Sequence, residues 1–405
     1  MTNSSAPLQG IRVLELCHVV AGPYASMYLA MMGAEVIKIE NPKTQGDLCR
    51  QTGPLTEHGS VRFCALNHNK QSVALDLSTA PGAELFLRLV EKADVVMDNF
   101  RPGVLDRLGV GYDAMKRVNP KIVYGNLSGF GTYGPYRNRP AFDMIAQALS
   151  GIMMINGEEN DPPMKIGTSM ADILAGINLV VGVLAGLHKA ETTGEGCFVE
   201  TSLVDSLVSA MTMEHINYFY HGETPRRIGN DYREWCPAGA FQAKDGWFVL
   251  ATGSEKSFRS LAACMGQTDW LEDETLTTHA ARVQRRCELN DAINRWGSVR
   301  TVEEICTLLQ NADVPCAPVN GIPDVSKDPH ISNAREMFSQ YEQPGMGSLT
   351  ATNIPLRFHN CSSVPLSAAP QLGQDTCSVL RNVLRVSDVE MVKLLDEIAA
   401  SQQEN

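Results

Sequence analysis

The hydrophobic and polar positions in the first half of the chain follow two periods, one typical of strands and one typical of helices. The segments with a strand-like pattern are Ile11–Leu16, Glu35–Ile39, Ser72–Asp76, Val95–Asn99, Ile122–Leu127 and Phe198–Ser202. The segments with a helical pattern are Ala21–Met32, Pro81–Lys92, Tyr112–Val118 and the long, very apolar Met170–Lys189. Because strands that alternate with helices form parallel sheets with right-handed crossovers, this half predicts an α/β domain.

The pattern changes after about residue 218. A second apolar helix is predicted to end near Tyr218, and residues 219–235 are polar and basic, which favours a linker. A hairpin is predicted next, from the two apolar segments Ala240–Ala243 and Trp247–Ala251. Further helices are predicted near Ser257–Met265, Arg282–Trp296 and Val302–Asn311. Residues 236–329 therefore predict a smaller α+β domain, and residues 330–405 return to mixed strands with a charged, helical end.

The composition limits the class of protein. A chain of 405 residues, 44% hydrophobic and 20% charged, matches a soluble globular enzyme. Its net charge of −12 repels phosphate backbones, so we expect no nucleic-acid partner. The first ten residues lack the pattern of a signal peptide, and no uninterrupted apolar run reaches the roughly 18 residues of a membrane span. We therefore expect a cytoplasmic protein with no membrane segment.

The cysteines and histidines do not form a recognisable metal motif. The eleven cysteines contain no C-x-x-C pair, and the nine histidines form no H-E-x-x-H helix. We therefore expect reduced thiols and no bound metal.

Residues 129–134 read G-F-G-T-Y-G, a G-x-G-x-x-G motif directly after a predicted strand. A dinucleotide-binding version must open a helix, because the pyrophosphate rests on free helix N–H groups. Here Pro135 and Pro140 follow, and two prolines so close together prevent that helix. The motif therefore favours an ordered loop that carries Arg137 and Arg139, with a nicotinamide oxidoreductase left as an alternative.

Asp172 lies in the first turn of the helix predicted at Met170–Lys189. One interpretation is structural, since Ser169 and Asp172 fit an S-x-x-D capping arrangement in which the acid satisfies free N–H groups. The other is functional: the positive helix end keeps the carboxylate ionised and aims it at the loop side of the sheet, where it is a competent nucleophile toward an activated acyl group. The residues alone favour the cap and leave both interpretations open.

Several cations of the α/β half lie near predicted strand ends. They are Lys38, Lys70, Arg101, Arg107, Arg137 and Arg139. Because the carboxyl ends of parallel strands form the ligand crevice of an open α/β sheet, these side chains predict a local site for a phosphorylated ligand in an acidic protein. A rim of solvated charges is the alternative.

Seven motifs occur in order along the chain. They are L-Q-G-I-R-V-L-E-L from Leu8, A-G-P-Y-A from Ala21, G-A-E-V-I-K-I-E from Gly33, N-K-Q-S-V-A-L-D-L from Asn69, D-N-F-R-P-G from Asp98, S-G-F-G-T-Y-G-P from Ser128 and M-A-D from Met170. Together they resemble the class III CoA-transferases, the CaiB/BaiF family that includes formyl-CoA transferase. The resemblance implies a large Rossmann-like domain with a parallel sheet, formed by residues 1–218 and 330–405, with the smaller α+β domain inserted between. It also implies a homodimer whose two subunits interlock like rings.

The resemblance also implies a site. Coenzyme A or an acyl-CoA would bind across the strand ends as a substrate, with no permanently bound cofactor, against Val19, Val20, Leu75, Asp76, Leu77, Ser78, Asn99, Phe100, Arg101, Arg107 and Arg139. Asp172 matches the catalytic aspartate of the family, which forms mixed anhydrides and an aspartyl-CoA thioester. Two departures limit the comparison: Asn41 stands where formyl-CoA transferase has an arginine, and residues 235–239 (W-C-P-A-G) replace its glycine-rich loop.

The leading hypothesis is a CoA-transferase that moves coenzyme A between an acyl-CoA and a free carboxylic acid. The racemase branch of the family pairs its aspartate with a histidine that aligns at Phe142, and a phenyl ring cannot move a proton, so racemisation is the alternative. A CoA-binding subunit without catalysis is a further alternative. Arg226, Arg227 and Arg233 predict a contact with the second carboxylate of a dicarboxylic acid such as succinate or glutarate.

Overall fold

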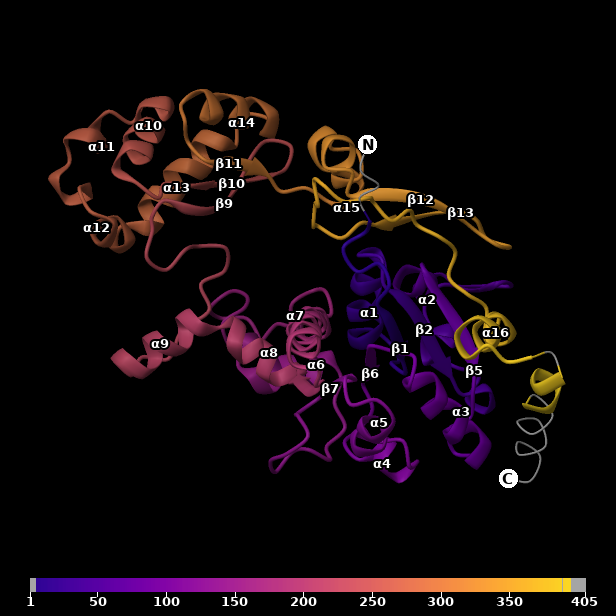
Figure 1. Cartoon of the computed structure of the whole chain (residues 1–405). Coiled ribbons are helices and arrows are strands. Elements are labelled where there is room, and N and C mark those ends of the chain that lie inside the picture. The colour runs from indigo at the N-terminus through magenta and orange to yellow at the C-terminus, as the bar shows by residue number, and fades with distance from the viewer. Residues whose placement is uncertain (1–4, 388, 395–405) are drawn as a thin grey trace. The chain divides into compact units, whose positions relative to one another are not determined.

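The computed structural model describes residues 5–387 and 389–394. The chain forms two compact units, one made of Met1–Ile152, Lys165–Ile216 and Glu336–Asn405, the other of Met153–Met164 and Asn217–Arg335. Each is described by itself (Figure 1). The boundaries predicted from the sequence, at 1–218, 219–235, 236–329 and 330–405, stay a prediction.

The first unit is built on a six-stranded parallel sheet, which confirms the predicted α/β fold. Its strands, in spatial order, are β5 (Lys70–Ala74), β2 (Glu35–Glu40), β1 (Arg12–Glu15), β6 (Val95–Asp98), β7 (Val123–Ser128) and β8 (Cys197–Ser202). The chain first moves outward from β1 to β2 and β5, then returns to the other side of β1 for β6. This reversal creates a switch point between β1 and β6, where open α/β sheets bind ligands beyond the carboxyl ends of their strands.

Helices cover both faces of this sheet. On one face α1 (Ala21–Met31) and the long α7 (Met170–Thr193) pack over side chains such as Val13 and Val123. On the other face α3 (Ala80–Val90), α5 (Tyr112–Val118) and α16 (Thr376–Leu384) pack over the alternate side chains, such as Leu14 and Ile37. Because successive strand residues point to opposite faces, the near-continuous apolar strands supply both cores.

Helix α7 packs one side into the core and leaves apolar side chains on another side, such as Val181, exposed. By length and composition alone it could cross a membrane, so the expectation that no segment is long enough is wrong in that respect. Its side chains Leu179 and Val183 are fully buried in the core shared with the sheet. Gly176 allows α1 to approach closely, because a Cβ there would lie 2.9 Å from the backbone oxygen of Ala21.

The first unit also contains short elements that the hydrophobic pattern does not predict. They are η1 (Pro42–Thr44), η2 (Leu48–Gln51), the hairpin β3 (Leu55–Thr56) and β4 (Gly59–Ser60), α2 (Val61–Asn67), α4 (Val104–Arg107), α6 (Asp143–Ser150) and η3 (Ile152–Met154). The hairpin β12 (Phe338–Gln343) and β13 (Gly347–Thr352) lies in the segment that was predicted to contain mixed strands. The helix predicted to run to Tyr218 is two helices instead, α8 (Leu203–Ala210) and α9 (Thr212–His221), which break at Met211.

The second unit contains a three-stranded antiparallel sheet, in the order β11 (Cys316–Pro318), β10 (Trp247–Ala251) and β9 (Ala238–Gln242). The predicted hairpin is confirmed as β9 and β10. Its helices are α10 (Glu255–Met265), α11 (Asp269–Glu272), α12 (His279–Gln284), α13 (Arg286–Gly297), α14 (Val302–Asn311) and α15 (Ile322–Val325), with short turns η4 (Glu274–Leu276) and η5 (Pro329–Ala334). The single helix predicted at Arg282–Trp296 is thus split between α12 and α13. Phe241, Phe248 and Phe258 form the centre of its separate core.

Candidate active site at the carboxyl edge of the sheet

Two loops meet at the switch point, one after β1 and one after β6. The backbone N–H of His18 donates to Oδ1 of Asn99 at 2.8 Å, and Nδ2 of Asn99 donates to the carbonyl of His18 at 2.7 Å. The His18 and Phe100 rings lie 5.5 Å apart. The predicted ligand residues Val19, Val20, Asn99 and Phe100 are therefore held at one edge, in the crevice that the strand order creates.

The predicted segment Leu75–Ser78 follows β5 at the same edge, but most of it is buried. Oδ1 of Asp76 accepts hydrogen bonds from the backbone and hydroxyl of Ser78, at 2.9 and 2.6 Å, and from Asn41 at 3.2 Å. Lys43 forms an ion pair with the same carboxylate at 3.3 Å. The Asp76 side chain therefore holds the loop, while Ser78 is exposed at the edge.

Exposed arginines surround this edge. Arg101 and Arg137 line a cavity of about 230 Å³ whose floor contains Asp98, Tyr124 and Asn126. Burial raises the pKa of Asp98 to about 6, although Tyr124 donates a hydrogen bond to it at 2.5 Å. Arg107 and Arg139 are exposed but do not line this cavity, and the guanidinium of Arg139 stacks over the ring of Tyr136 at 3.7 Å.

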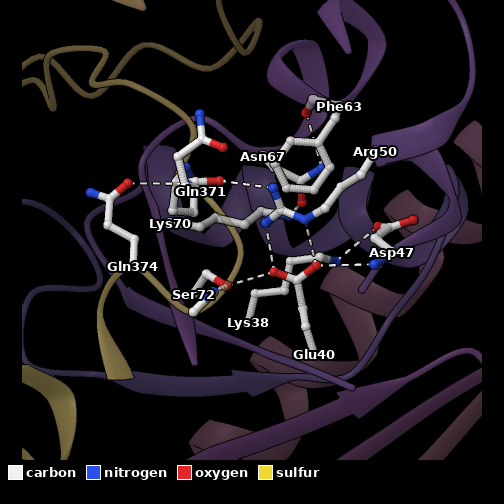
Figure 2. Close-up of polar contacts among 12 residues, drawn as sticks. Lys38, Glu40, Asp47, Arg50, Phe63, Asn67, Lys70, Ser72, Gln371 and Gln374 are labelled. Carbon is white, nitrogen blue, oxygen red and sulfur yellow. Dashed lines mark hydrogen bonds and ion pairs between the residues drawn. The ribbon is translucent and has the colours of Figure 1, made fainter. Parts of the chain in front are cut away.

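Lys38 and Lys70 are not surface cations, so the prediction that they meet a phosphorylated ligand is wrong. Both ammonium groups are fully buried and share the carboxylate of Glu15, at 2.9 and 3.1 Å. Lys38 also pairs with Asp47 at 3.0 Å. Figure 2 shows these lysines within a polar network that also contains Glu40, Asp47 and Arg50. The sequence could not distinguish them from solvated cations, because their partners come from other strands and loops.

Asp172 lies in the first turn of α7, at the same edge of the sheet as the two loops, because a crossover helix starts where the preceding strand ends. It is one turn before Gly176 and shares its helix face, which directs its side chain towards the start of α1. Its carboxylate accepts no hydrogen bond from the described residues, and it does not cap the helix.

The capping role belongs to Asp143. Oδ1 of Asp143 accepts the backbone N–H of Ala171 at 2.8 Å, and Oδ2 accepts Nε2 of Gln147 at 2.7 Å. Ser169 is the N-cap of α7 but makes no capping hydrogen bond through its side chain. The structural interpretation of Ser169 and Asp172 as a capping pair is therefore wrong, which leaves the Asp172 carboxylate free for another use.

The expectation that the helix end keeps Asp172 ionised at neutral pH is wrong for part of the population, because the pKa of this carboxyl group lies near neutral. Burial and the nearby negative charge of Asp143 raise the pKa of Asp172 to about 7, and the charge of Arg62 only partly opposes them. Desolvation, together with the charge of Asp143, thus outweighs the opposing charge of Arg62. A carboxyl group with a pKa near neutral is a signature of functional sites in clefts.

Arg62 is a cation that sequence reasoning missed. It lies on α2, is exposed, and its guanidinium makes no hydrogen bond or ion pair with any residue in the described ranges. Its stem lies over Gly53, where a Cβ would come within 2.7 Å of the Arg62 Cβ. Nothing in the local sequence V-R-F-C-A marks it, because its relation to Asp172 arises from the packing of α2 and α7 around α1.

The other predicted features have local roles. No helix opens after G-F-G-T-Y-G, as predicted, and the backbone N–H of Thr132 in this loop donates to the carboxylate of Glu200 at 3.1 Å.

In the second unit, Arg227 donates to the carbonyls of Glu158, Glu159 and Asp161, and Arg226 pairs with Glu159 at 3.7 Å. Arg233 donates to the carbonyl of Arg226. Arg227 is thus committed to the backbone of its own unit.

No metal site is found in the part of the chain that the structure describes, where no three His, Cys, Asp or Glu side chains converge.

The chain matches known proteins over nearly all of its length. The model of CoA-transferase family III matches residues 8–376. The succinyl-CoA:mesaconate CoA-transferase of Haloarcula hispanica is 36% identical over 383 residues, which cover 92% of this chain and 95% of that protein. The succinyl-CoA:glutarate CoA-transferase of Mus musculus is 31% identical over 404 residues, covering 99% and 92%. The crystal structure of a CAIB/BAIF family protein from Brucella suis superposes with a TM-score of 0.84 at 32% identity, covering 94% of this chain and 100% of that one.

Proposed function

Since the chain belongs to CoA-transferase family III, we propose that Asp172 is the residue through which it transfers coenzyme A. The enzyme moves coenzyme A between an acyl-CoA and a free carboxylic acid, and the resemblance found in the seven motifs is confirmed. The chemistry at Asp172, the binding residues and the acids themselves form the proposal.

The proposed reaction uses only the carboxylate and the two substrates. An Asp172 oxygen attacks the thioester carbonyl of the donor, the C–S bond breaks, and coenzyme A leaves as the thiolate with the electron pair. The thiolate then attacks the Asp172 carbonyl of this mixed anhydride, which releases the donor acid and leaves an aspartyl-CoA thioester. The acceptor carboxylate attacks that thioester to form a second anhydride. The returning thiolate attacks the acceptor carbonyl, which yields the new acyl-CoA and frees Asp172.

The observation that carries this proposal is the unused carboxylate of Asp172 at the ligand edge of the sheet. A carboxylate that neither caps its helix nor accepts a hydrogen bond from the described residues has its lone pairs available for attack. Its pKa of about 7 leaves a substantial ionised fraction at neutral pH and makes the oxygen more basic than that of an ordinary aspartate.

We propose that coenzyme A lies along the strand ends. The backbone at Val19, Val20, Asn99 and Phe100 would frame the pantetheine at the switch point. The remaining proposed contacts are Leu75, Asp76, Leu77, Ser78, Arg101, Arg107 and Arg139, among which the three exposed arginines suit the phosphates.

The proposed acids are dicarboxylates. The relatives named above act on succinyl-CoA together with mesaconate or glutarate, and each of these acids carries a second carboxylate. Arg62 supports this choice, since its guanidinium has no ion pair with the described residues and its charge reaches Asp172. We therefore propose Arg62, rather than Arg226, Arg227 or Arg233, as the partner of the second carboxylate.

The finer architecture is also a proposal. A small domain inserted into a large CoA-binding domain is supported by the chain path, which leaves the first unit before residue 217 and returns at 336. We propose an interlocked homodimer in the cytoplasm. Light scattering after gel filtration tests the dimer, and a mass that matches one chain would contradict it.

Racemisation is not favoured. Phe142, which aligns with the racemase histidine, is the N-cap of α6, next to Asp143, and its ring has no proton to exchange.

The proposal is tested by incubating the protein with succinyl-CoA and each of a panel of acids, including glutarate, mesaconate and acetate, and following acyl-CoA products by chromatography. Asp172→Asn, which keeps the side-chain shape, should abolish exchange with every acid. The matched control is Asp205→Asn, on α8 outside the proposed site. Exchange at the normal rate in Asp172→Asn would exclude the mechanism.

A further inference from the structure

Val19 adopts a backbone conformation that its side chain disfavours. Its φ is +69°, in the left-handed region, where a β-branched residue is a genuine outlier. Such strain persists only where the surroundings enforce it, and it concentrates at functional sites. Val19 belongs to the loop between β1 and α1 that is proposed to face coenzyme A, so the contacts that enforce its conformation bear on ligand binding.

Both peptide groups of Val19 are held by the turn at residues 47–49. The backbone N–H of Val19 donates to Oδ1 of Asp47 at 3.0 Å, and its carbonyl accepts the Sγ–H of Cys49 at 3.1 Å. The same Oδ1 accepts the backbone N–H of Cys49 at 2.9 Å. On the preceding residue, the two hydrogen bonds between His18 and Asn99 fix the other end of the loop. Asp47 is therefore the side chain that ties Val19 in place.

Asp47 is itself rigidly placed although it is fully buried. Its Oδ2 pairs with Lys38 at 3.0 Å, and its own N–H donates to Oε1 of Glu40 at 3.0 Å. Glu40 in turn accepts from Arg50 at 2.8 and 2.6 Å and from Ser72 at 2.6 Å (Figure 2). Burial opposes the charge of Asp47, but Lys38 and the N–H groups of Val19 and Cys49 outweigh it and lower its pKa to about 2.

Lys38 also contacts the loop between β1 and α1 directly. Its ammonium donates to the carbonyl of Cys17 at 2.6 Å and to Glu15 at 2.9 Å. Arg50 also donates to the carbonyl of Pro370 at 3.0 Å, which joins the network to the C-terminal part of the chain. Three cations, Lys38, Lys70 and Arg50, thus balance three carboxylates, Glu15, Glu40 and Asp47. A balanced network of this kind can hold a loop that is strained by itself.

The strained residue determines how α1 begins. Val20 is the N-cap of α1 and makes no side-chain capping bond, so the first N–H groups of the helix are not capped from that residue. Gly22 packs directly on the loop, since a Cβ there would lie 2.3 Å from the Sγ of Cys17. If Val19 relaxed to an extended conformation, the loop and the start of α1 would separate from Asn99.

We infer that Asp47 is a positioning residue, which acts through Val19 to hold the loop between β1 and α1 in the conformation that binds coenzyme A. The inference rests on the proposed role of that loop, but not on the chemistry at Asp172. Asp47 is enclosed and does not touch the ligand itself. Its removal should therefore lower the fraction of enzyme in the binding-competent conformation, and so raise the apparent KM without changing the chemical step.

A rescue experiment separates this role from a general contribution to stability. Asp47→Ala should raise the KM for succinyl-CoA roughly tenfold or more, as expected when one strained residue loses its support, with kcat changed by less than about threefold. Val19→Gly in the same protein should restore the KM to within about threefold of wild type, because glycine adopts a positive φ without help. Val19→Gly alone is the reference for the double variant: adding Asp47→Ala to it should change its KM by less than about threefold, which separates the support given by Asp47 from any direct contact of the Val19 side chain with coenzyme A.

Matched variants complete the test. Asp94 directly precedes β6, and its Oδ2 accepts the backbone N–H of Arg12, the first residue of β1, at 2.8 Å. Asp94→Ala therefore removes a comparable hydrogen bond at the amino edge of the sheet and should not change the KM. If Asp47→Ala does not fold, Asp47→Asn, which keeps an acceptor for Val19 but loses the pairing with Lys38, should raise the KM by a smaller factor that Val19→Gly again reverses.

An unchanged KM in the folded Asp47 variant, or a raised KM that Val19→Gly does not reverse, would overturn the inference. Failure of the proposed chemistry is distinguishable: exchange that persists in Asp172→Asn rejects the covalent mechanism whatever the Asp47 variants do.

Discussion

Asp172→Asn should make the protein more stable at neutral and alkaline pH while it abolishes transfer. The folded protein keeps the Asp172 proton up to pH of about 7, whereas the unfolded chain releases it near 3.8. Between these values the folded state binds more protons, so the stability of the wild type falls as pH rises through this window. Asparagine carries no proton to lose, and the variant escapes that fall.

The magnitude follows from the pKa. At about 1.4 kcal/mol per pKa unit, a rise from 3.8 to about 7 sets an upper limit of about 4 kcal/mol. Asp172 is only half-buried, and solvent screening reduces this to about 1–2 kcal/mol. For a chain of 405 residues, with an unfolding entropy of about 2.1 cal/mol/K per residue, that difference corresponds to a Tm higher by roughly 1–2 °C in the variant.

The assay is thermal unfolding of wild type and Asp172→Asn across a pH series, followed by differential scanning calorimetry, because all four tryptophans lie in the second unit and would not report on the unit that contains Asp172. The Tm difference should be near zero at about pH 4, grow through the window, and level off above pH 7. Asp205→Asn serves as the control for the loss of an aspartate elsewhere. A difference that does not depend on pH, or a variant that is less stable at about pH 8, would refute the reasoning that Asp172 is a strained, desolvated carboxylate.

Three further predictions concern the surroundings of Asp172. Asp143→Asn keeps an acceptor for the N–H of Ala171 but removes the negative charge beside Asp172. Because adduct formation needs the ionised carboxylate of Asp172, its rate should reach half its maximum at a lower pH than in wild type. A stopped-flow pH profile measures this midpoint, and an unchanged or higher midpoint contradicts the prediction. Arg62→Met should lower kcat/KM for succinate and glutarate roughly tenfold or more, since a hydrogen bond to a charged group contributes about 1.5–3 kcal/mol. The kcat/KM for acetate, which has no second carboxylate, should not change. An equal loss for all three acids would contradict a contact between Arg62 and the second carboxylate. Gly176→Val should lower the stability by about 1–3 kcal/mol through overpacking against Ala21 and Tyr24, measured as a lower Tm, and a Tm equal to wild type would show that α1 and α7 are not in close contact.

The fold was largely predictable from the sequence because its strands and long helices are marked by their own apolar periodicity. Helix α5 coincides with the predicted Tyr112–Val118, and α3 falls within two residues of the predicted Pro81–Lys92 at each end, with Thr79 capping it through the N–H of Gly82. The short elements between residues 42 and 67 were missed, because the conformation of polar segments such as the turn at Asp47 is determined by contacts with Lys38 and Val19 from other parts of the chain. The break at Met211 likewise has no local signal, since no glycine or proline marks it.

The site was predictable in its position but not in its electrostatics. Asp172 follows from its place at a helix start after a strand, together with the family resemblance. Its raised pKa does not, because it depends on burial and on Asp143, which is far away in sequence. Lys38 and Lys70 were misread for the same reason: whether a strand-end lysine is solvated or buried depends on whether a carboxylate from another strand, here Glu15, reaches it.

The most direct measurement follows oxygen from the acceptor acid into the protein. In the proposed cycle, the final attack of the thiolate on the acceptor carbonyl leaves one acceptor oxygen on the Asp172 carboxylate. Turnover with succinyl-CoA and ¹⁸O-labelled glutarate, followed by digestion and mass spectrometry, should therefore place the heavy isotope in the peptide that contains Asp172 and in no other peptide. Complete exchange of coenzyme A with no heavy oxygen on Asp172 would contradict the covalent mechanism.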